Sequence, residues 1–452
     1  MKSANLGTDP VKQLVLRLAL PAMLAQFVNV LYSIVDRMYI GNIPQIGETA
    51  LAGVGICGPI VTMISAFASW IGVGGAPLMS IRMGQKDMDG ARKILANCFL
   101  LMFLMSGLLI VSAYTVKAPL LRAFGATETI FPYADSYMSI YLCGTLFAIL
   151  SLGLNQFIIC QGYSGLGMLS VVIGALVNIV LDPVFIFVFN MGVAGAACAT
   201  VLSQLASCLF TLWILLFGKK TPITITFKGY EPRICIRVLT VGLTPFLIIL
   251  FDNVLIIIQN VMLKLYGGAE SDLLLTCNTI VQSFMLMITM PLSGISGGTQ
   301  SILGFNYGAG KHDRIHLAER HIIKTGVIFC TIMFLLAQFA SPVFIRLFTQ
   351  DSLYIERTAG FIRIYTLGVI PLAVQYAIVD GFTGMSISQV SLPLSFFRKA
   401  LYIALVVIFC IFIGADAMFW AEPISDVIAP IVSTVTYLIM LPKILKHQSL
   451  RA

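Results

Sequence analysis

Long apolar segments recur along almost the whole chain, and short polar stretches separate them. Each segment has about 20 residues or more, enough for an α-helix to cross a hydrocarbon core about 30 Å thick. The segments lie at approximately residues 14–39, 50–78, 94–116, 131–158, 166–188, 193–217, 235–265, 274–304, 322–345, 359–382, 394–414 and 417–441. The pattern predicts an all-α polytopic membrane protein with twelve transmembrane helices.

The composition excludes an ordinary soluble domain. Of the 452 residues, 58% are hydrophobic and 11% are charged, whereas soluble domains carry about 25% charged residues. Most of the 28 Lys and Arg residues fall on the side of the membrane that holds the two termini, and such residues accumulate on the cytoplasmic side. We therefore expect a multi-pass protein of the cell (inner or plasma) membrane with both termini in the cytoplasm. This distribution explains the net charge of +8 without a nucleic-acid partner.

The sequence matches itself when it is shifted by 224 residues. The matching pairs include Pro21/Pro245, Phe27/Phe251, Asn29/Asn253, Gly84/Gly308, Arg122/Arg346 and Gly144/Gly368. Each half then holds six helices, an even number, so both halves enter the membrane from the same side and a pseudo-two-fold axis along the membrane normal relates them. We expect an N-lobe at residues 1–220 (helices 1–6) and a C-lobe at residues 221–452 (helices 7–12). Such lobes favour alternating access over a fixed pore.

The fifth apolar segment contains two polar side chains in the run ALVNIVLDPVFIF, residues 175–187. Asn178 and Asp182 are four residues apart and therefore share one helix face. Pro183 cannot donate a backbone hydrogen bond, so a carbonyl one turn earlier loses its donor. Ionisable groups inside a membrane usually face the protein interior and have a function. The combination of oxygens predicts a pocket for a small hard cation or a proton.

The first apolar segment has a similar polar face. Asn29, Tyr32 and Asp36 are spaced i, i+3 and i+7, which places them on one stripe of a helix. The residue 224 positions after Asp36 is Asn260, so the charge is specific to the first half, and the equivalent helix packs without it. Asp252 and Asp380 are the other deep acids.

Three stretches resemble the multidrug and toxic compound extrusion (MATE) transporters. They are LPAMLAQFVNVLYSIVDRMYIG (20–41), NMGVAGAACATVLSQ (190–204) and GFNYGAGKHDR (304–314). The resemblance covers essentially the whole chain, and within the family the sequence is similar to the DinF-like and MepA-like branches. It implies a secondary active transporter that exports cationic amphipathic compounds by antiport with H⁺ or Na⁺.

The resemblance also implies a cation-coupling site in the N-lobe. The matching positions are Asp36, Asn178, Asp182, Thr200 and Asn155. Pro21 matches the proline at which the first helix of the family bends, and Pro183 is the second candidate hinge. Three simpler interpretations stay open: Asp182 as a neutral structural acid, Asp36 neutralised by Arg37, and Thr200 as a small packing residue.

We expect further residues to line a substrate cavity. They are Asn29, Tyr32, Asp252, Asp380 and Met287. The NorM-like branch of the family uses acids on helices 7 and 10, roughly where Asp252 and Asp380 lie, and a structural or rim role is the alternative for both. Met287 is included because methionine-rich surfaces adapt to varied ligands.

Other function classes receive less support from the sequence. There is no P-loop, which argues against ATP as the energy source, and the four histidines form no HExxH motif, which disfavours an intramembrane enzyme. A lipid or lipid-linked oligosaccharide flippase of the same superfamily remains an alternative, but it would need deep basic residues, and we expect none beyond Arg37. We expect no cofactor, only the coupling ion, and a monomer in the lipid bilayer.

Overall fold

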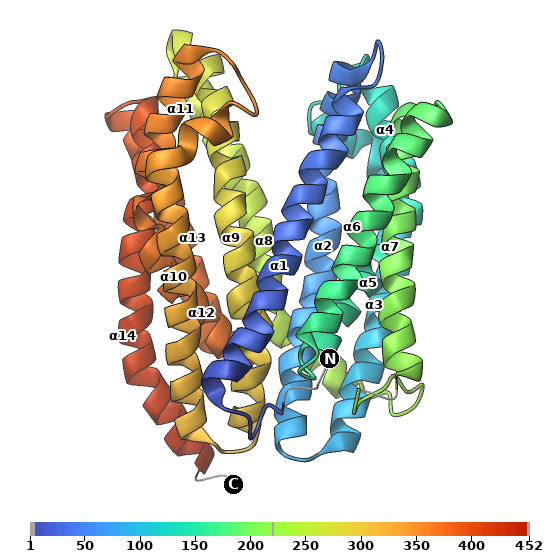
Figure 1. Cartoon of the computed structure of the whole chain (residues 1–452), viewed down its shortest axis with the longest axis vertical. Helices are drawn as coiled ribbons and strands as arrows, with labels where there is room; N and C mark the ends of the chain where they lie inside the picture. Colours follow the sequence, from blue (N-terminus) through green and yellow to red (C-terminus); the bar gives the residue numbers. More distant parts are fainter. Residues whose placement is uncertain (1–4, 219–220, 450–452) are drawn as a thin grey trace.

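The computed structural model describes residues 5–218 and 221–449 as a bundle of long helices (Figure 1). The first half contains α1 (Val11–Gly41), α2 (Gly47–Gly84), α3 (Met88–Ala123), α4 (Phe131–Cys143), α5 (Thr145–Ile159), α6 (Ser164–Pro183), η1 (Val184–Val188) and α7 (Gly192–Phe217). The second half contains α8 (Pro232–Tyr266), η2 (Gly268–Glu270), α9 (Ser271–Gly308), α10 (His312–Ile345), α11 (Ser352–Tyr365), η3 (Thr366–Gly368), α12 (Val369–Gly384), α13 (Ser388–Phe412), η4 (Ala415–Trp420) and α14 (Ala421–Ser449).

The predicted number of membrane spans is confirmed. Within the described part of the chain, 11 spans are long and apolar enough to cross a membrane, and α4 with α5, bent by 57° at Gly144, makes up to 12. Several helices extend beyond the apolar segments that predicted them. For example, α10 begins at His312 rather than near residue 322, and α13 begins at Ser388 rather than near residue 394. Polar side chains in these extra turns therefore belong to the helical bundle.

Two groups of helices lie side by side, α1–α7 on the right of Figure 1 and α8–α14 on the left. One apolar core contains buried residues between Ile40 and Val241, and another contains buried residues between Leu255 and Ala421. The beginning of α1 packs with helices of the second group, and the beginning of α8 packs with the first. The fold is therefore the predicted pair of six-helix lobes. The predicted boundary at 220/221 falls beside residues 219–220, which lie outside the described residues, and it stays a prediction.

The repeat at 224 residues extends to the backbone conformation. Residues with positive φ recur at this offset in the pairs Lys86/Gly310, Gly162/Ser386 and Asn190/Gly414. Each pair lies in the connection that follows equivalent helices, so the two halves turn at the same points. The offset therefore holds some 45 residues beyond Gly144/Gly368, and it identifies equivalent positions in the two lobes.

The lobes touch through glycines on α2, α8 and α9. A Cβ atom at Gly242 would lie 1.8 Å from the carbonyl oxygen of Trp70, and one at Gly84 would lie 2.0 Å from that of Phe305. On the symmetry-related side, a Cβ at Gly298 would lie 2.4 Å from the Cβ of Ala22 in α1. Small residues allow helices in membranes to approach this closely. The backbones of the two lobes are therefore in direct contact.

Candidate functional site

The N-lobe contains a group of buried polar side chains on α6. Asn178 Nδ2 donates a hydrogen bond of 3.2 Å to Asp182 Oδ1, and both residues are buried, with relative exposures of 1% and 0%. Asn178 Oδ1 and Asp182 Oδ2 are buried without a hydrogen-bond partner among the described residues. Unpaired buried oxygens are costly, so these two atoms are available to a ligand.

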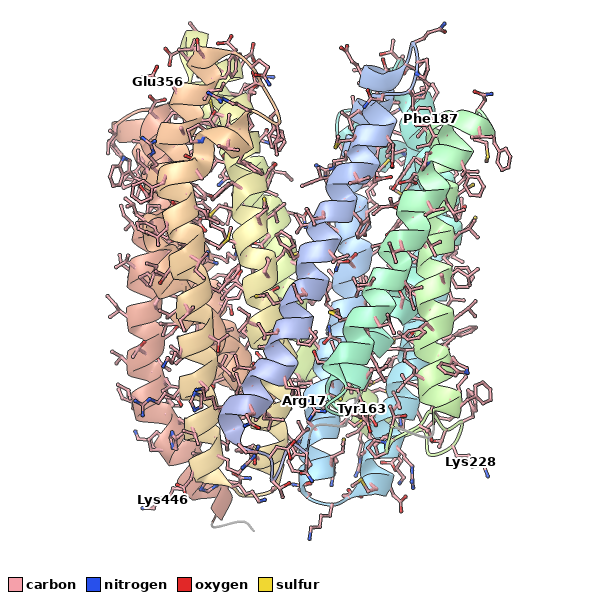
Figure 2. The ribbon with its side chains drawn as sticks, in the orientation of Figure 1. Arg17, Tyr163, Phe187, Lys228, Glu356 and Lys446 are labelled. Carbon is pink, nitrogen blue, oxygen red and sulfur yellow. The ribbon has the colours of Figure 1, made fainter. Side chains whose placement is uncertain are left out.

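The backbone changes conformation directly after Asp182. The α-helix ends at Pro183, and the π-turn η1 follows, in which Phe189 N donates to Val184 O over 2.9 Å. Gly195 at the beginning of α7 packs against this turn, since a Cβ there would lie 2.8 Å from the carbonyl carbon of Phe185. Isolated π-turns occur often at functional sites. Phe187, in this turn, lies near the upper end of the lobe in Figure 2, so the group on α6 is in the half of the molecule away from the C-terminus.

Asp36 of α1 completes the group. Its carboxyl group lies close enough to that of Asp182 for the two to interact electrostatically, and Asp36 Oδ1 is also buried without a partner within residues 5–218 and 221–449. Tyr32, one turn earlier on α1, lies close to both acids. Two ionised carboxylates at this distance repel each other strongly. The pair can be stable only with a proton or a cation between the two groups.

Arg37 does not occupy this position. Its side chain is exposed, and among the ion pairs of the described residues none joins it to Asp36. Adjacent residues on a helix point about 100° apart. The charge of Arg37 therefore acts on Asp36 only from a distance, through water.

Thr200 is connected to the acids through a tyrosine. Its hydroxyl lies near that of Tyr137 on α4, and Tyr137 lies close to Asp36. The ring of Tyr137 stacks on that of Tyr141 at 6.1 Å, and Gln204 Nε2 donates to the Tyr141 hydroxyl over 3.3 Å. The sequence analysis did not include Tyr137. The spacing of four between the two tyrosines was the signal available, but paired aromatic residues at helical spacing are more often part of a core.

Removing the Tyr137 hydroxyl is a mild test of this arrangement. In Tyr137→Phe, we expect the coupling-ion concentration for half-maximal transport to rise about two- to tenfold, the equivalent of one lost hydrogen bond of about 0.5–1.5 kcal/mol. The ring and its stacking remain, so the maximal rate should be unchanged. Tyr133→Phe, on the same helix, is the control. If transport by Tyr137→Phe depends on the ion concentration as in the wild type, Thr200 does not act on the proposed ion site through Tyr137.

The structure places three of the predicted residues outside this group. Asn155 of α5 accepts a hydrogen bond of 3.2 Å from Ser170, which is two turns or about 12 Å along α6 from Asn178. Asn29 donates to Gln26 of the same helix over 3.3 Å. Met287 is half-buried on α9 against the C-lobe core. The hinge candidate Pro21 lies inside α1, beside Ala22, where α1 meets α9.

The C-lobe acids have partners of their own. Asp252 forms an ion pair with Lys399 of α13 and has a side chain that is 47% exposed. Asp380 of α12 accepts a hydrogen bond from Ser296 of α9. The two acids therefore lie in different environments, and only Asp252 has a basic partner.

One expectation about charge is wrong. Arg398 is a deep basic residue: it lies ten residues into the 25-residue helix α13 and is 7% exposed. Its guanidinium donates 2.8 Å hydrogen bonds to Glu422 and to Asp426, both on α14. Its burial was not expected, because the apolar segment that predicted this helix begins near residue 394 and places Arg398 close to its end, whereas α13 begins at Ser388. Glu422 and Asp426 lie in the first two turns of α14, directly after η4.

Comparisons with known proteins identify the family. The MatE family model matches residues 21–184 and 248–408, more than half of the chain. The multidrug export protein MepA of Staphylococcus haemolyticus (strain JCSC1435) is 27% identical over 342 residues, covering 74% of this chain and 72% of that protein. MepA of Staphylococcus aureus (strain MRSA252) is 22% identical over 380 residues, covering 83% and 81%.

Solved structures agree in fold. The outward-facing conformation of a multidrug resistance MATE family transporter of the MOP superfamily superposes with a TM-score of 0.90 at 24% identity, covering 99% of this chain and 100% of that one. A MOP superfamily transporter from Pyrococcus furiosus, described as having a binding pocket of reversed polarity, gives a TM-score of 0.91 at the same identity and coverage. The family match, the two six-helix lobes and the shared fold lead to one conclusion: this chain belongs to the MATE family of membrane transporters.

Proposed function

We propose that this protein is a secondary active multidrug efflux transporter that exports cationic amphipathic compounds in exchange for H⁺ or Na⁺. The observation that carries the proposal is the facing pair of carboxyl groups of Asp36 and Asp182. A transporter that couples to a cation needs buried oxygens that can accept it and later release it. The names of the MepA relatives, which describe multidrug export, support the choice of substrate class.

The pair connects ion binding to the contact between the lobes. Asp182 belongs to α6 inside the N-lobe, whereas Asp36 is on α1, the helix that packs against α9 of the C-lobe. An ion that enters between the two acids removes their repulsion and draws α1 toward α6. Because Ala22, next to Pro21, contacts Gly298 of α9, a movement of α1 changes the lobe contact. Ion binding outside thus favours substrate release outside and the return of the lobes.

The cation site accepts either ion. Asp36 Oδ1, Asn178 Oδ1 and Asp182 Oδ2 are three oxygens without partners in the described structure, and with the second oxygens of the two acids they suit a small hard cation. A single proton shared by the carboxyls satisfies the same atoms. Asn29, Tyr32, Met287, Asp252 and Asp380 remain the proposed substrate-contacting residues. The proposed protein is a cell-membrane monomer with cytoplasmic termini that uses neither ATP nor a cofactor and catalyses no reaction.

The flippase alternative has to be weighed again because of Arg398. A buried arginine is what a pyrophosphate-carrying lipid would require. Two carboxylates already hold this guanidinium at 2.8 Å, so the group of three carries a net negative charge and would repel a phosphate. Arg398 therefore supports a cationic substrate rather than an anionic one.

Dye transport in everted vesicles tests the proposal. The purified protein is reconstituted, and uptake of a fluorescent cationic dye is followed under an imposed Na⁺ gradient and, separately, an imposed pH gradient. We expect one gradient to drive dye accumulation, which identifies the coupling ion. If the dye moves equally with and without both gradients, antiport is wrong, and movement of a labelled lipid in the same vesicles would then support the flippase.

A further inference from the structure

A second pair of buried carboxyl groups lies in the C-lobe, between α10 and α12. Glu319 of α10 is 2% exposed, and its Oε1 has no hydrogen-bond partner within the described chain. Its carboxyl group lies against Gly381, where a Cβ would be 2.8 Å from Oε2. Asp380 directly precedes Gly381 in the chain, and the carboxyl groups of Glu319 and Asp380 interact electrostatically. An unpaired and almost fully buried carboxyl group is costly unless it holds a proton or a cation.

The two acids differ in their hydrogen bonds. Asp380 accepts a hydrogen bond from Ser296 of α9, and Gln300 of the same helix packs against α12 at Gly384, one turn beyond Asp380. A donor directed at a carboxyl group stabilises its ionised form. Glu319 receives no such donor from the described residues, and the titratable groups nearest to it are Asp380 and Tyr437 of α14. The charge therefore belongs on Asp380 and the proton on Glu319.

Basic side chains do not neutralise the pair. The basic residues of α10 within one turn of Glu319 are His316, Arg320 and His321. The first two are exposed and His321 is partly exposed, whereas Glu319 lies on the buried stripe with Ile315, Ala318 and Ile322. On α12, Tyr376 is the other titratable group near Asp380. Among the ion pairs of the described chain, none includes Glu319 or Asp380.

The repeat shows that packing does not require these acids. At the offset of 224 residues, Glu319 and Gly381 correspond to Leu95 and Phe157, which are fully buried members of the N-lobe core. The ring of Phe157 in the N-lobe is replaced by Gly381 in the C-lobe. The carboxyl group of Glu319 fills the space beside this glycine. The polar residues of α9 also replace small residues, since Ser296 and Gln300 correspond to Gly72 and Ala76 of the N-lobe. Three apolar or small positions of one lobe are thus polar in the other, whereas Asp380 corresponds to Gln156 and is polar in both.

The Glu319–Asp380 pair and the contact between the lobes lie on opposite faces of α9. Ser296 and Gln300 face Asp380 from α9, whereas Gly294 and Gly298, which alternate with them, pack against Ala22 of α1. Residues two apart on a helix point about 200° apart, so α9 carries the acid site on one face and the lobe contact on the other. Gly304, further along α9, fits between Gly384 of α12 and Pro77 of α2.

We infer that Glu319 and Asp380 form a second proton-binding site, in the C-lobe, where one proton is held on Glu319 beside the ionised Asp380. The site lies near the beginning of α10 and the end of α12, whereas Asp36 and Asp182 lie near the ends of α1 and α6. Loss of this proton leaves two adjacent negative charges under α9. The repulsion shifts α9 and with it the contact to α1. The coupling role rests on the proposed antiport, whereas proton binding itself does not.

Infrared spectroscopy of the purified full-length protein in lipid nanodiscs tests proton binding directly. A protonated buried carboxyl group gives a C=O stretching band that is separate from ionised carboxylates and sensitive to D₂O. At neutral pH, Glu319→Gln is expected to lose one such band, and Asp380→Asn is expected to shift it without removing it. Glu356→Gln, an exposed glutamate of the same lobe (Figure 2), is the control and should match the wild type. A wild-type spectrum in Glu319→Gln overturns the site, and loss of the band in Asp380→Asn overturns the assignment of the proton to Glu319.

Three further measurements separate proton binding from folding, from metal binding and from the coupling role. The double variant Glu319→Leu with Gly381→Phe copies the N-lobe pair Leu95 and Phe157, and it should melt cooperatively and lack the band. If Na⁺ at constant pH removes the wild-type band, the site binds a metal cation, and the proton assignment is wrong.

In vesicles, Glu319→Gln should transport with one proton fewer per substrate, and an unchanged stoichiometry would overturn the coupling role alone. Absence of any gradient-driven transport by the wild type would count against the proposed antiport and not against the band.

Discussion

Substitution of Asp182 by Asn is expected to abolish gradient-driven export while leaving the protein folded. One coupling ion that crosses about 100 mV supplies about 2.3 kcal/mol, which supports a gradient of roughly fifty-fold for a neutral substrate. For a monocationic dye that exchanges with one such ion no net charge crosses, and the imposed ion gradient alone drives accumulation. Without the second carboxylate, Asp36 no longer has a partner with which to share a proton or a cation. The accumulation ratio of the dye should therefore fall to about one.

The same substitution should not reduce stability. Asp182 is fully buried, and its Oδ2 has no partner among the described residues. Removing an uncompensated buried charge usually stabilises a fold or leaves it unchanged. The variant is compared with the wild type by thermal melting in detergent and by dye accumulation in vesicles. Asp89→Asn removes the same charge from a side chain that is 88% exposed in the same lobe and should behave as the wild type. Wild-type accumulation by Asp182→Asn would remove Asp182 from the coupling mechanism.

The largest expected loss of stability follows from Arg398→Met. The substitution leaves Glu422 and Asp426 buried, at 7% and 0% exposure, without their basic partner. Breaking a buried ion pair from one side costs about 3–5 kcal/mol. We expect a large decrease in melting temperature. We also expect most of this loss to be recovered in the triple variant Arg398→Met, Glu422→Gln, Asp426→Asn, which has no buried charge to compensate.

The neighbouring residue supplies a matched control. Lys399 pairs with Asp252, whose side chain is 47% exposed, so water can solvate the aspartate when the lysine is removed. Lys399→Met should therefore cost no more than about 1 kcal/mol. Equal destabilisation by the two substitutions would show that burial of the acids is not the cause, and failure of the triple variant to recover would show that Arg398 acts through packing.

The sequence was sufficient for the helices and for bringing together the two polar residues of α6 that belong to the proposed ion site, for physical reasons. Apolar segments of membrane length are unambiguous, and Asn178 and Asp182 lie four apart inside one of them. Glu319 was missed because the first turns of α10 are polar and resemble a loop, so that the predicted span began near residue 322. Arg398 was misplaced for a similar reason at the beginning of α13. Glu319 and Arg398 are both buried by neighbouring helices, and the sequence around each of them does not indicate this burial.

The link between Thr200 and Asp36 could not be predicted from spacing either. It depends on Tyr137, which is on a different helix, α4, next to the 57° bend at Gly144. The direction of a side chain after such a bend is a tertiary property. The repeat, in contrast, could be followed further along the chain once the backbone was known. Residues with positive φ occur at equivalent turns of the two lobes even where their side chains differ.

The glycine contacts between the lobes have a consequence for conformational populations. At Gly242, Gly84 and Gly308, a backbone carbonyl of the other lobe lies where a side chain would begin, so the contact consists of Cα–H···O interactions. Each of these is worth about 0.5–1 kcal/mol, and three of them together hold the closed arrangement by about 1.5–3 kcal/mol. Side chains add to this contact beside Gly242, where Trp70 donates a hydrogen bond of 2.7 Å to the carbonyl oxygen of Leu239 and stacks on Phe246 at 4.4 Å. The glycine contacts alone contribute about as much as the energy of one ion that crosses the membrane potential, so they are weak enough for ion binding to influence how the lobes meet.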